Sequence, residues 1–250
     1  MEKTLNLIKN DPWLEPYKDA IVGRFEHAMD KKAELTNGGK STLSDFASGY
    51  LYFGLHRTDK GWIFREWAPN ASHIYMVGTF SNWEEKPTYK LKRLKNGNWE
   101  IKLPADAIKH GDLYKLHVYW EGGQGERIPA WANRVVQDES TKIFSAQVWV
   151  PEKPFKFKKK TFKPSTDPLL IYECHIGMAQ QEEKVGTYNE FREKILPRIA
   201  KEGYNCIQIM AIQEHPYYGS FGYHVSSFFA ASSRFGTPEE LKLLIDTAHE

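Results

Sequence analysis

The hydrophobic pattern of this 250-residue chain changes along its length, and this change constrains the fold more than any other feature. From Tyr50 to about Val150, short apolar stretches alternate with polar residues and stop at turn signals, which is typical of β-strands. Before that region apolar residues recur at helical spacing, and after it strand patterns alternate with helix patterns. We therefore expect a multi-domain chain whose parts belong to different fold classes.

Residues 1–48 are predicted to form an N-terminal helical segment. Apolar residues between Ile21 and Met29 recur at the spacing of an amphipathic helix. The sequence Asn37-Gly38-Gly39 ends that pattern, because such residues favour turns.

Residues 49–150 are predicted to form an all-β, immunoglobulin-like sandwich. The stretches 62–67, 73–77 and 114–120 each read as a strand. Asn96-Gly97 lies between two further strand patterns and is a strong signal for a tight hairpin. Several short strands separated by turns over about 100 residues favour two packed antiparallel sheets.

Residues 151–168 are predicted to be a linker. Three prolines, Pro151, Pro154 and Pro164, surround the basic run from Lys156 to Lys160. A charge run of this kind is most simply a solvated connection.

Residues 169–250 show the pattern strand, helix, strand, helix. The apolar run Leu169–Tyr172 predicts a parallel strand buried on both faces, and Cys206–Ile212 predicts a second strand. Capping boxes begin the helices at Thr187 and Thr237, and Pro197 is expected to kink the first helix. Two βα units cannot close a parallel sheet, so we expect the chain to be a fragment of a longer protein.

Composition and charge exclude several classes of function. The net charge of +2 gives no electrostatic footprint for nucleic acid or an anionic membrane. No apolar run approaches the ~20 residues of a membrane-spanning helix, and the first residues do not resemble a secretory signal. The two cysteines, Cys174 and Cys206, are expected to be buried free thiols in a reducing compartment, which favours a cytoplasmic location. His175, His215 and His224 lack the spacing of a zinc site, so no metal is expected.

Many short motifs, in the right order, resemble those of one enzyme family. Five segments resemble the opening of the catalytic barrel of 1,4-α-glucan (glycogen) branching enzymes: Tyr172–Met178, Leu196–Ile199, Gly203–Gln208, Tyr217–Val225 and Phe228–Leu241. Upstream, Glu66–Ala71 and Gly78–Trp83 resemble a family-48 carbohydrate-binding module. Arg127–Trp131 and Arg134–Asp138 are similar to the eukaryotic-type branch of the family.

The resemblance implies that residues 169–250 are the first two βα units of an incomplete (β/α)8 TIM barrel in glycoside hydrolase family 13. It implies a retaining reaction in which an α-1,4-glucan chain is cleaved and transferred to a 6-hydroxyl to form an α-1,6 branch. The family's catalytic carboxylates are expected beyond Glu250, so the chain itself is expected to be inactive. The implied partner is glycogen or another α-1,4-glucan, with no cofactor, and the protein is expected to be a monomer.

The same resemblance suggests which residues bind substrate. Tyr223 corresponds to the ring that stacks under the sugar at the cleavage point, and His224 follows it where some relatives carry Gln. The surface that holds a malto-oligosaccharide corresponds to Trp67, Ala68, Pro69, Lys95, Asn96, Gly97, Asn98, Gly39 and Lys40, and Trp83 corresponds to a binding ring in some related modules. The competing interpretations are that Tyr223 is loop packing and that Trp67 and Trp83 belong to the sandwich core.

Two other functions are compatible with these motifs. One keeps the family but changes the reaction to hydrolysis of α-glucan, as in debranching or amylase-type enzymes. The other is a non-catalytic α-glucan-binding protein that ends near Glu250. The second is disfavoured because two βα units alone would leave a parallel strand edge open, and open edges aggregate.

Overall fold

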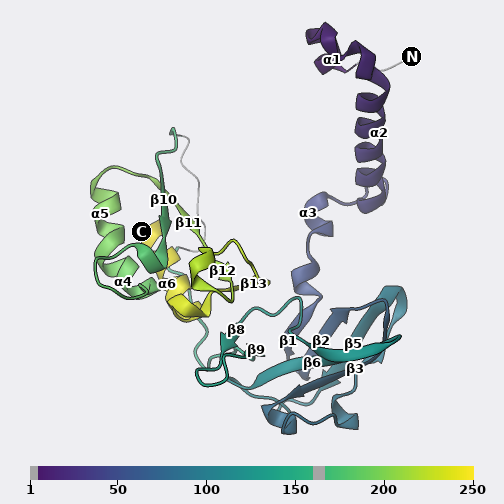
Figure 1. Ribbon diagram of the computed structural model, residues 1–250, viewed down its shortest axis with the longest axis vertical. Coiled ribbons are helices and arrows are strands. Elements are labelled where there is room, and N and C mark those ends of the chain that lie inside the picture. Colours follow the sequence, from purple (N-terminus) through teal and green to yellow (C-terminus); the bar gives the residue numbers. More distant parts are fainter. Residues whose placement is uncertain (1–4, 160–166) are drawn as a thin grey trace. The chain divides into compact units, whose positions relative to one another are not determined.

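The computed structural model describes residues 5–159 and 167–250 and falls into two compact units, Met1–Tyr52 and Phe53–Glu250 (Figure 1). The first unit holds α1 (Asn6–Asn10), α2 (Lys18–Leu35) and α3 (Leu43–Phe46). Helix α2 confirms the predicted helix, and it ends just before Asn37, whose φ of 51° begins the turn. None of the side chains of α2 is buried, so its apolar stripe stays uncovered within this unit.

The second unit begins with two antiparallel sheets, as the strand patterns predicted. The four-stranded sheet has the order β1 (Gly54–Thr58), β2 (Gly61–Trp67), β5 (Asn98–Leu103) and β4 (Lys92–Arg93). The five-stranded sheet has the order β3 (Ala71–Gly78), β6 (Leu113–Trp120), β9 (Phe144–Gln147) and β8 (Val135–Gln137), with β7 (Gly123–Arg127) also paired to β6.

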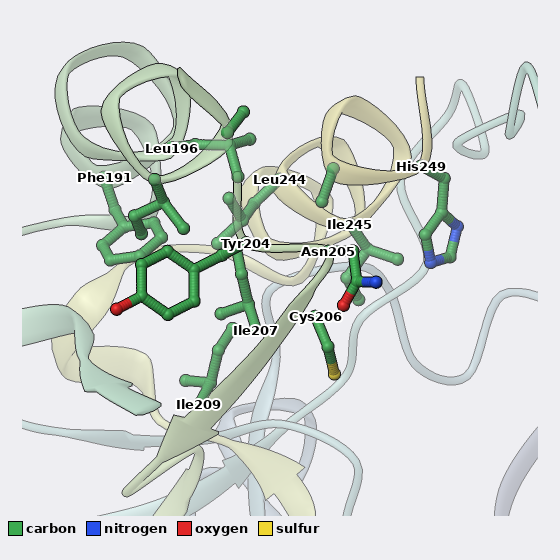
Figure 2. Close-up of a pocket in the computed structure, with 13 residues that line it drawn as sticks. Phe191, Leu196, Tyr204, Asn205, Cys206, Ile207, Ile209, Leu244, Ile245 and His249 are labelled. Carbon is green, nitrogen blue, oxygen red and sulfur yellow. The ribbon is translucent and has the colours of Figure 1, made fainter. Parts of the chain in front are cut away.

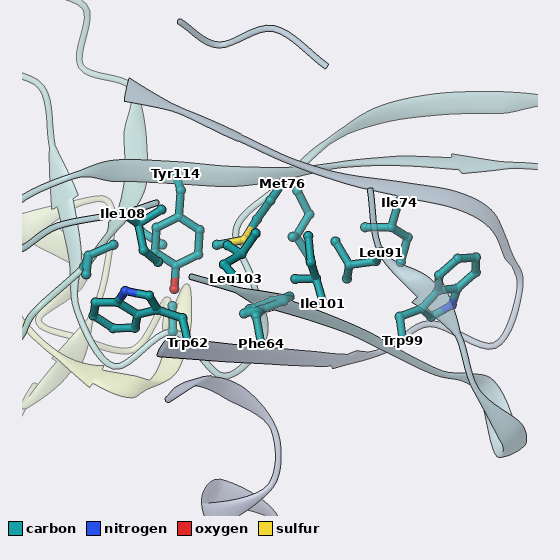
Figure 3. Packing of buried hydrophobic residues seen from close by; sticks show 14 of the residues in the cluster. Trp62, Phe64, Ile74, Met76, Leu91, Trp99, Ile101, Leu103, Ile108 and Tyr114 are labelled. Carbon is teal, nitrogen blue, oxygen red and sulfur yellow. The ribbon is translucent and has the colours of Figure 1, made fainter. Parts of the chain in front are cut away.

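The hydrophobic core lies between these two sheets (Figure 3). Phe64 on β2 is fully buried and meets Tyr114 on β6 edge-to-face, with 6.3 Å between the ring centroids. Trp62 and Trp99 are buried in the same cluster, so these two tryptophans are the core rings of the four-stranded sheet. The residues facing the core alternate along each strand with residues facing outward, as a two-sheet sandwich requires.

The hairpin between β4 and β5 forms at Asn96-Gly97, but the predicted two-residue turn is a longer loop, because Lys95 joins these two residues in one turn. Arg93 pairs with Trp99 and Lys92 with Glu100 across the turn. Asn96 and Gly97 have φ values of 59° and 77°, the left-handed conformation that these two residue types accept most readily.

A buried carboxylate joins β2 to the loop that precedes β8. Glu66 is only 6% exposed, and its two oxygens accept hydrogen bonds from the backbone N–H groups of Trp67 at 3.0 Å and Ala130 at 2.9 Å. Burial raises the pKa of this carboxyl, although the two N–H donors act in the opposite direction. The folded state therefore binds the proton of Glu66 more tightly than the unfolded chain does.

The remainder of the unit contains the predicted βα elements. Strand β10 (Ile171–His175) runs parallel to β11 (Cys206–Met210), and β12 (Gln213–Glu214) pairs with β13 (Ser227–Ala231). The first helical stretch comprises α4 (Tyr188–Glu190), a π-helical turn (Phe191–Ile195) and α5 (Leu196–Lys201), and the second is α6 (Pro238–His249).

Both predicted helix starts are confirmed. Thr187 and Thr237 each accept a hydrogen bond from the N–H three residues later, and the Glu at that position bonds back. The π-helical turn lies directly before α5, in which Pro197 occupies the first turn. Pro197 cannot donate a backbone hydrogen bond, so the irregular turn before it is the predicted kink.

Two predictions for this region are wrong in detail. The second strand ends at Met210 rather than Ile212, because Ala211 has a φ of 58° and leaves the extended conformation. Leu169, Leu170 and Ile171 are 60%, 56% and 48% exposed, although their apolar run predicted burial on both faces. Strand β10 pairs with β11 alone, and burial begins only at Cys174 and His175.

Hydrogen bonds connect the sandwich and the linker to the last helical region. The guanidinium of Arg134 donates to the carbonyl of Gly236 at 2.8 Å and lies 4.8 Å from the ring of Trp149. The carboxylate of Asp246 on α6 accepts from the backbone N–H groups of Lys158 at 3.0 Å and Lys159 at 3.3 Å. The basic run is thus held by its backbone, while Lys160 and Pro164 of the predicted linker lie outside the described residues.

Both cysteines are free, but they differ in burial. Cys174 is buried, as expected, and burial raises the pKa of its thiol to about 11. Cys206 is partly exposed, so its predicted burial is wrong, because it lies at the first position of β11.

Among the described residues, no helix is both long and apolar enough to cross a membrane.

Replacement of the central core ring tests the sandwich. Phe64→Ala should lower the free energy of unfolding by about 3–5 kcal/mol, because it removes a fully buried aromatic ring and leaves a cavity. Denaturant-induced unfolding measures this loss. The matched control is Phe25→Ala on the exposed face of α2, which should change stability by no more than about 0.5 kcal/mol. Equal effects of the two substitutions would contradict the assigned core.

The raised pKa of Glu66 predicts a specific pH dependence. Because the folded-state pKa exceeds the unfolded one, the stabilisation is present at low pH and is lost as pH rises through the folded pKa. We therefore expect the free energy of unfolding of wild type, minus that of Glu66→Gln, to fall as pH rises from the unfolded-state pKa of about 4.3 toward neutrality. Unfolding curves across that range measure the difference, and one that rises with pH would contradict the assignment.

Candidate functional site

The end of β2 and the turn between β4 and β5 are joined by hydrogen bonds, and together they carry an exposed indole. Trp67 at the end of β2 is 58% exposed, and its indole Nε1 donates to the carbonyl of Asn96 at 3.0 Å. The backbone N–H of Ala68 donates to the carbonyl of Gly97 at 2.9 Å. A Cβ atom at Gly97 would lie 2.7 Å from Pro69, so only glycine permits this approach. We call Trp67, Ala68, Pro69 and the turn 95–98 the Trp67 surface.

Side-chain donors from the buried Trp99 and the exposed Arg93 fix the backbone behind the Trp67 surface. The indole Nε1 of Trp99 donates to the carbonyl of Ala68 at 2.9 Å, and the guanidinium of Arg93 donates to the carbonyl of Pro69 at 2.8 Å. The Arg93 guanidinium also lies 5.7 Å from the centre of the Trp99 ring. The loop that carries Trp67 is therefore rigidly supported, and the interpretation of Trp67 as a core ring is wrong.

A second exposed tryptophan lies on the five-stranded sheet. Trp83 follows β3 and is 41% exposed, so it is not a core ring either. The ammonium of Lys115 on β6 lies 5.9 Å from the centre of its ring. Trp83 borders a groove of about 410 Å³, here called the Trp83 groove, which is lined by Trp83, Leu113, Lys115, Glu126, Asp138, Ser140, Thr141, Ile143 and Ser145.

The Trp83 groove combines one ring face with many polar groups. The backbone N–H of Thr141 and the hydroxyls of Ser140 and Thr141 donate hydrogen bonds to the carboxylate of Asp138, which lowers the pKa of that carboxyl to about 2. The ammonium of Lys115 bonds to the carboxylate of Glu126 at 2.7 Å. An apolar ring beside paired charges and hydroxyls suits a neutral ligand with apolar faces and hydroxyl edges.

Tyr223 and His224 lie apart from both tryptophans in the sequence and in their contacts. Both are exposed, and Tyr223 is 81% exposed, so the loop-packing interpretation does not hold for this ring. The backbone N–H of Tyr223 bonds to the carbonyl of Ser220 at 3.0 Å. A Cβ atom at Gly222, whose φ is 81°, would lie 2.5 Å from Ala211, so glycine is required at the position before Tyr223.

Gly39 and Lys40 belong to the unit Met1–Tyr52, whereas the Trp67 surface belongs to the second unit. The N–H of Gly39 bonds to the carbonyl of Thr36 at 3.0 Å, which shapes the turn after α2. Lys40 is exposed. Their participation in the Trp67 surface remains a prediction.

The carboxylates of the βα region are occupied by structural hydrogen bonds. Glu214 is 1% exposed and accepts from the backbone N–H of Ser233 at 2.7 Å and of His215 at 3.2 Å. Glu173 accepts from the side chain of Gln208 at 3.2 Å, and Asp246 holds the linker backbone. Within residues 5–159 and 167–250, no cluster of acidic, histidine and cysteine side chains is arranged to hold a metal ion.

The apolar pocket between α5, β11 and α6 has a volume of about 360 Å³ (Figure 2). Its walls are side chains such as Leu196, Ile207 and Leu244, and the polar Asn205 and His249 lie at its edge. Such a lining lacks the convergent polar groups of a substrate site, so we assign it to packing. The apolar residues on both faces of β11 are the sequence feature that predicts packing on this strand.

Comparisons with known proteins find a family model and solved structures that are similar to this chain. A family model described as carbohydrate-binding module 48 (isoamylase N-terminal domain) matches residues 52–132, which include Trp67 and Trp83. Among solved structures, a putative alpha amylase from Salmonella typhimurium matches with a TM-score of 0.63 at 20% identity, covering 79% of this chain and 31% of that chain. A pullulanase described as in complex with maltotetraose matches with a TM-score of 0.63 at 19% identity, covering 79% and 32%. These likenesses show that the chain shares its fold with part of each of these solved proteins.

Relatives of known name match almost the whole chain. A protein from Dictyostelium discoideum named 1,4-alpha-glucan-branching enzyme is 44% identical over 98% of this chain and 36% of its own length. Proteins of the same name from Saccharomyces cerevisiae and Equus caballus are 43% and 41% identical, each over 97% of this chain and over 37% and 35% of their own lengths. The chain thus spans just over a third of the length of these relatives, and over that span it is similar to proteins named 1,4-alpha-glucan-branching enzyme from several eukaryotes.

Proposed function

We propose that the protein is a 1,4-α-glucan branching enzyme and that this chain contributes α-glucan binding to it. The reaction cleaves an α-1,4 chain and transfers it to a 6-hydroxyl through a retaining double displacement. The observation that carries the proposal is the 44% identity to a protein of that name over 98% of the chain. The exposed Trp67, on a rigid frame within the matched module, supports the binding role.

The chemistry itself is assigned to the part of the relatives that this chain does not span. A retaining mechanism needs two carboxyl groups that can reach one glycosidic bond. Glu214 and Asp246 are both buried and engaged with backbone N–H groups, which makes them supports rather than catalysts. The proposal therefore keeps the catalytic nucleophile and acid outside this chain.

The proposed roles of the parts of the chain follow the predicted domains. We assign residues 1–48 to a helical segment, 49–150 to a glucan-binding sandwich, 151–168 to a linker and 169–250 to the start of a (β/α)8 barrel. Parallel pairing of β10 with β11 and the α-amylase-family fold of the solved relatives support the last assignment. In that barrel Tyr223 would stack under the sugar at the cleavage point, and its 81% exposure leaves the ring free to do so.

The proposed setting is the cytoplasm, with glycogen as the natural substrate and the protein acting as a monomer without a cofactor. Two unpaired cysteines are consistent with a reducing compartment. The net charge of +2 favours a neutral polysaccharide over nucleic acid or an anionic membrane.

The Trp67 surface predicts a measurable loss of binding. Trp67→Ala should weaken binding of glycogen about threefold to tenfold, because it removes an exposed ring with a fixed frame. The chain should stay folded, since the substitution removes one hydrogen bond and no core ring. Affinity electrophoresis in glycogen-containing native gels measures the retardation.

The control for that experiment is Trp67→Phe, which keeps a ring but loses the indole donor, and it should retain most of the retardation. An unchanged retardation of Trp67→Ala would contradict the assigned surface. Unfolding of this variant, seen by circular dichroism, would show that the ring supports the fold instead.

The assignment of catalysis predicts no activity for the 250-residue chain alone. Incubation with amylose should change neither the iodine colour nor the number of reducing ends. The full-length protein should lower iodine staining with little release of reducing ends, since transfer conserves them and hydrolysis does not. Reducing ends released in step with the loss of staining would favour the hydrolytic alternative.

A further inference from the structure

The outer face of β6 carries an aromatic strip that begins at the Trp83 groove and extends beyond it. Tyr114 and Leu116 face the core, so Lys115, His117 and Tyr119 face outward along the same strand. From Lys115 to Tyr119 the strand advances about 13 Å at about 3.3 Å per residue. The strip therefore continues along β6 from Lys115, which lines the groove.

Rings from two adjacent strands are gathered on this face. His117 stacks on Tyr119 with 4.9 Å between ring centroids and 25° between planes. Tyr75 and His73 on β3 meet the ring of Tyr119 edge-on, at 6.4 Å and 6.2 Å. None of these rings belongs to the core, and all are partly or fully accessible. We call Tyr75, His117 and Tyr119 the β6 strip.

One carboxylate fixes the orientation of the β6 strip. Oε1 of Glu85 accepts a hydrogen bond from the hydroxyl of Tyr119 at 2.7 Å and lies 2.6 Å from Nδ1 of His117. The hydrogen bond to Glu85 raises the pKa of Tyr119, which keeps that hydroxyl protonated. Both contacts use the same oxygen, so Oε2 of Glu85 is left to accept from a ligand hydroxyl.

Charges along the strip are balanced. The ammonium of Lys90 lies 5.4 Å from the centre of the Tyr75 ring, Glu85 contacts Tyr119 and His117, and Lys115 is paired with Glu126. Two ammonium groups beside two carboxylates attract neither a polyanion nor a polycation. A neutral chain of hydroxyl-bearing rings complements such a face, because rings stack on its apolar sides while the charged groups bond its hydroxyls.

We propose that the β6 strip is an additional subsite that continues the Trp83 groove and selects longer α-1,4-glucan chains over short ones. The inference rests on the proposed glucan binding and deepens it. A short oligosaccharide fills the groove beside Trp83 and Lys115. A longer one also reaches Tyr119 and Tyr75, and it gains affinity from those rings.

The experiment uses the 250-residue chain in a Trp67→Ala background, so that the Trp67 surface contributes less to the measured binding. Dissociation constants for maltotriose and maltoheptaose are measured by calorimetry. The double substitution Tyr75→Ala/Tyr119→Ala should weaken maltoheptaose about threefold to tenfold and leave maltotriose unchanged. Trp83→Ala should weaken both ligands. Trp13→Ala, which removes an 87% exposed ring outside the sandwich, is the matched control and should change neither.

Two further measurements keep the test decisive if the double variant unfolds. Tyr119→Phe keeps the stacking ring and should retain most of the affinity for maltoheptaose. In the Trp67→Ala protein, backbone amide resonances of His117 and Tyr119 should shift with maltoheptaose and not with maltotriose.

The failures of the two proposals are distinguishable. Equal affinity of the double variant and its parent for maltoheptaose, or amide shifts confined to the groove, would overturn the β6 strip while glucan binding stands. If the chain with Trp67 intact binds neither ligand nor glycogen, the proposed glucan binding itself fails.

Discussion

The two-residue period of strand β6 is the constraint on which the rest of the sandwich depends. This strand pairs with β3, β7 and β9, so it holds the five-stranded sheet together. One of its faces supplies Tyr114 and Leu116 to the core, and the other carries the partly exposed Lys115 and Tyr119. A slip of one residue would exchange the two faces and destroy core and surface together.

Local chemistry explains which parts of the fold were predictable. The hairpin at Asn96-Gly97 and the helix starts at Thr187 and Thr237 depend on residues within four positions of one another, and all three are confirmed. The exposure of Leu169 and Leu170 depends on which elements cover them, and the apolar run alone carries no such information. Ala211 ends its strand through its backbone conformation, which its residue type does not favour.

The candidate site also has features that the sequence predicts and features that depend on the tertiary structure. Family motifs pointed to Trp67 and Trp83, but only the structure shows that both are exposed while Trp62 and Trp99 fill the core. The outward alternation along β6 was visible in the sequence. Its meeting with Tyr75 and Glu85 was not, because that depends on the register between β3 and β6 and on the loop after Trp83.

Trp67 ends a strand of one sheet, whereas Trp83 follows a strand of the other. A branched polymer displays many chain ends close together, so a module that binds through both rings is bivalent toward it. The second contact is then intramolecular, and its effective concentration exceeds that of free chains. The protein would stay on a branched particle while releasing any one chain, and a linear oligosaccharide too short to span both rings would gain no such retention.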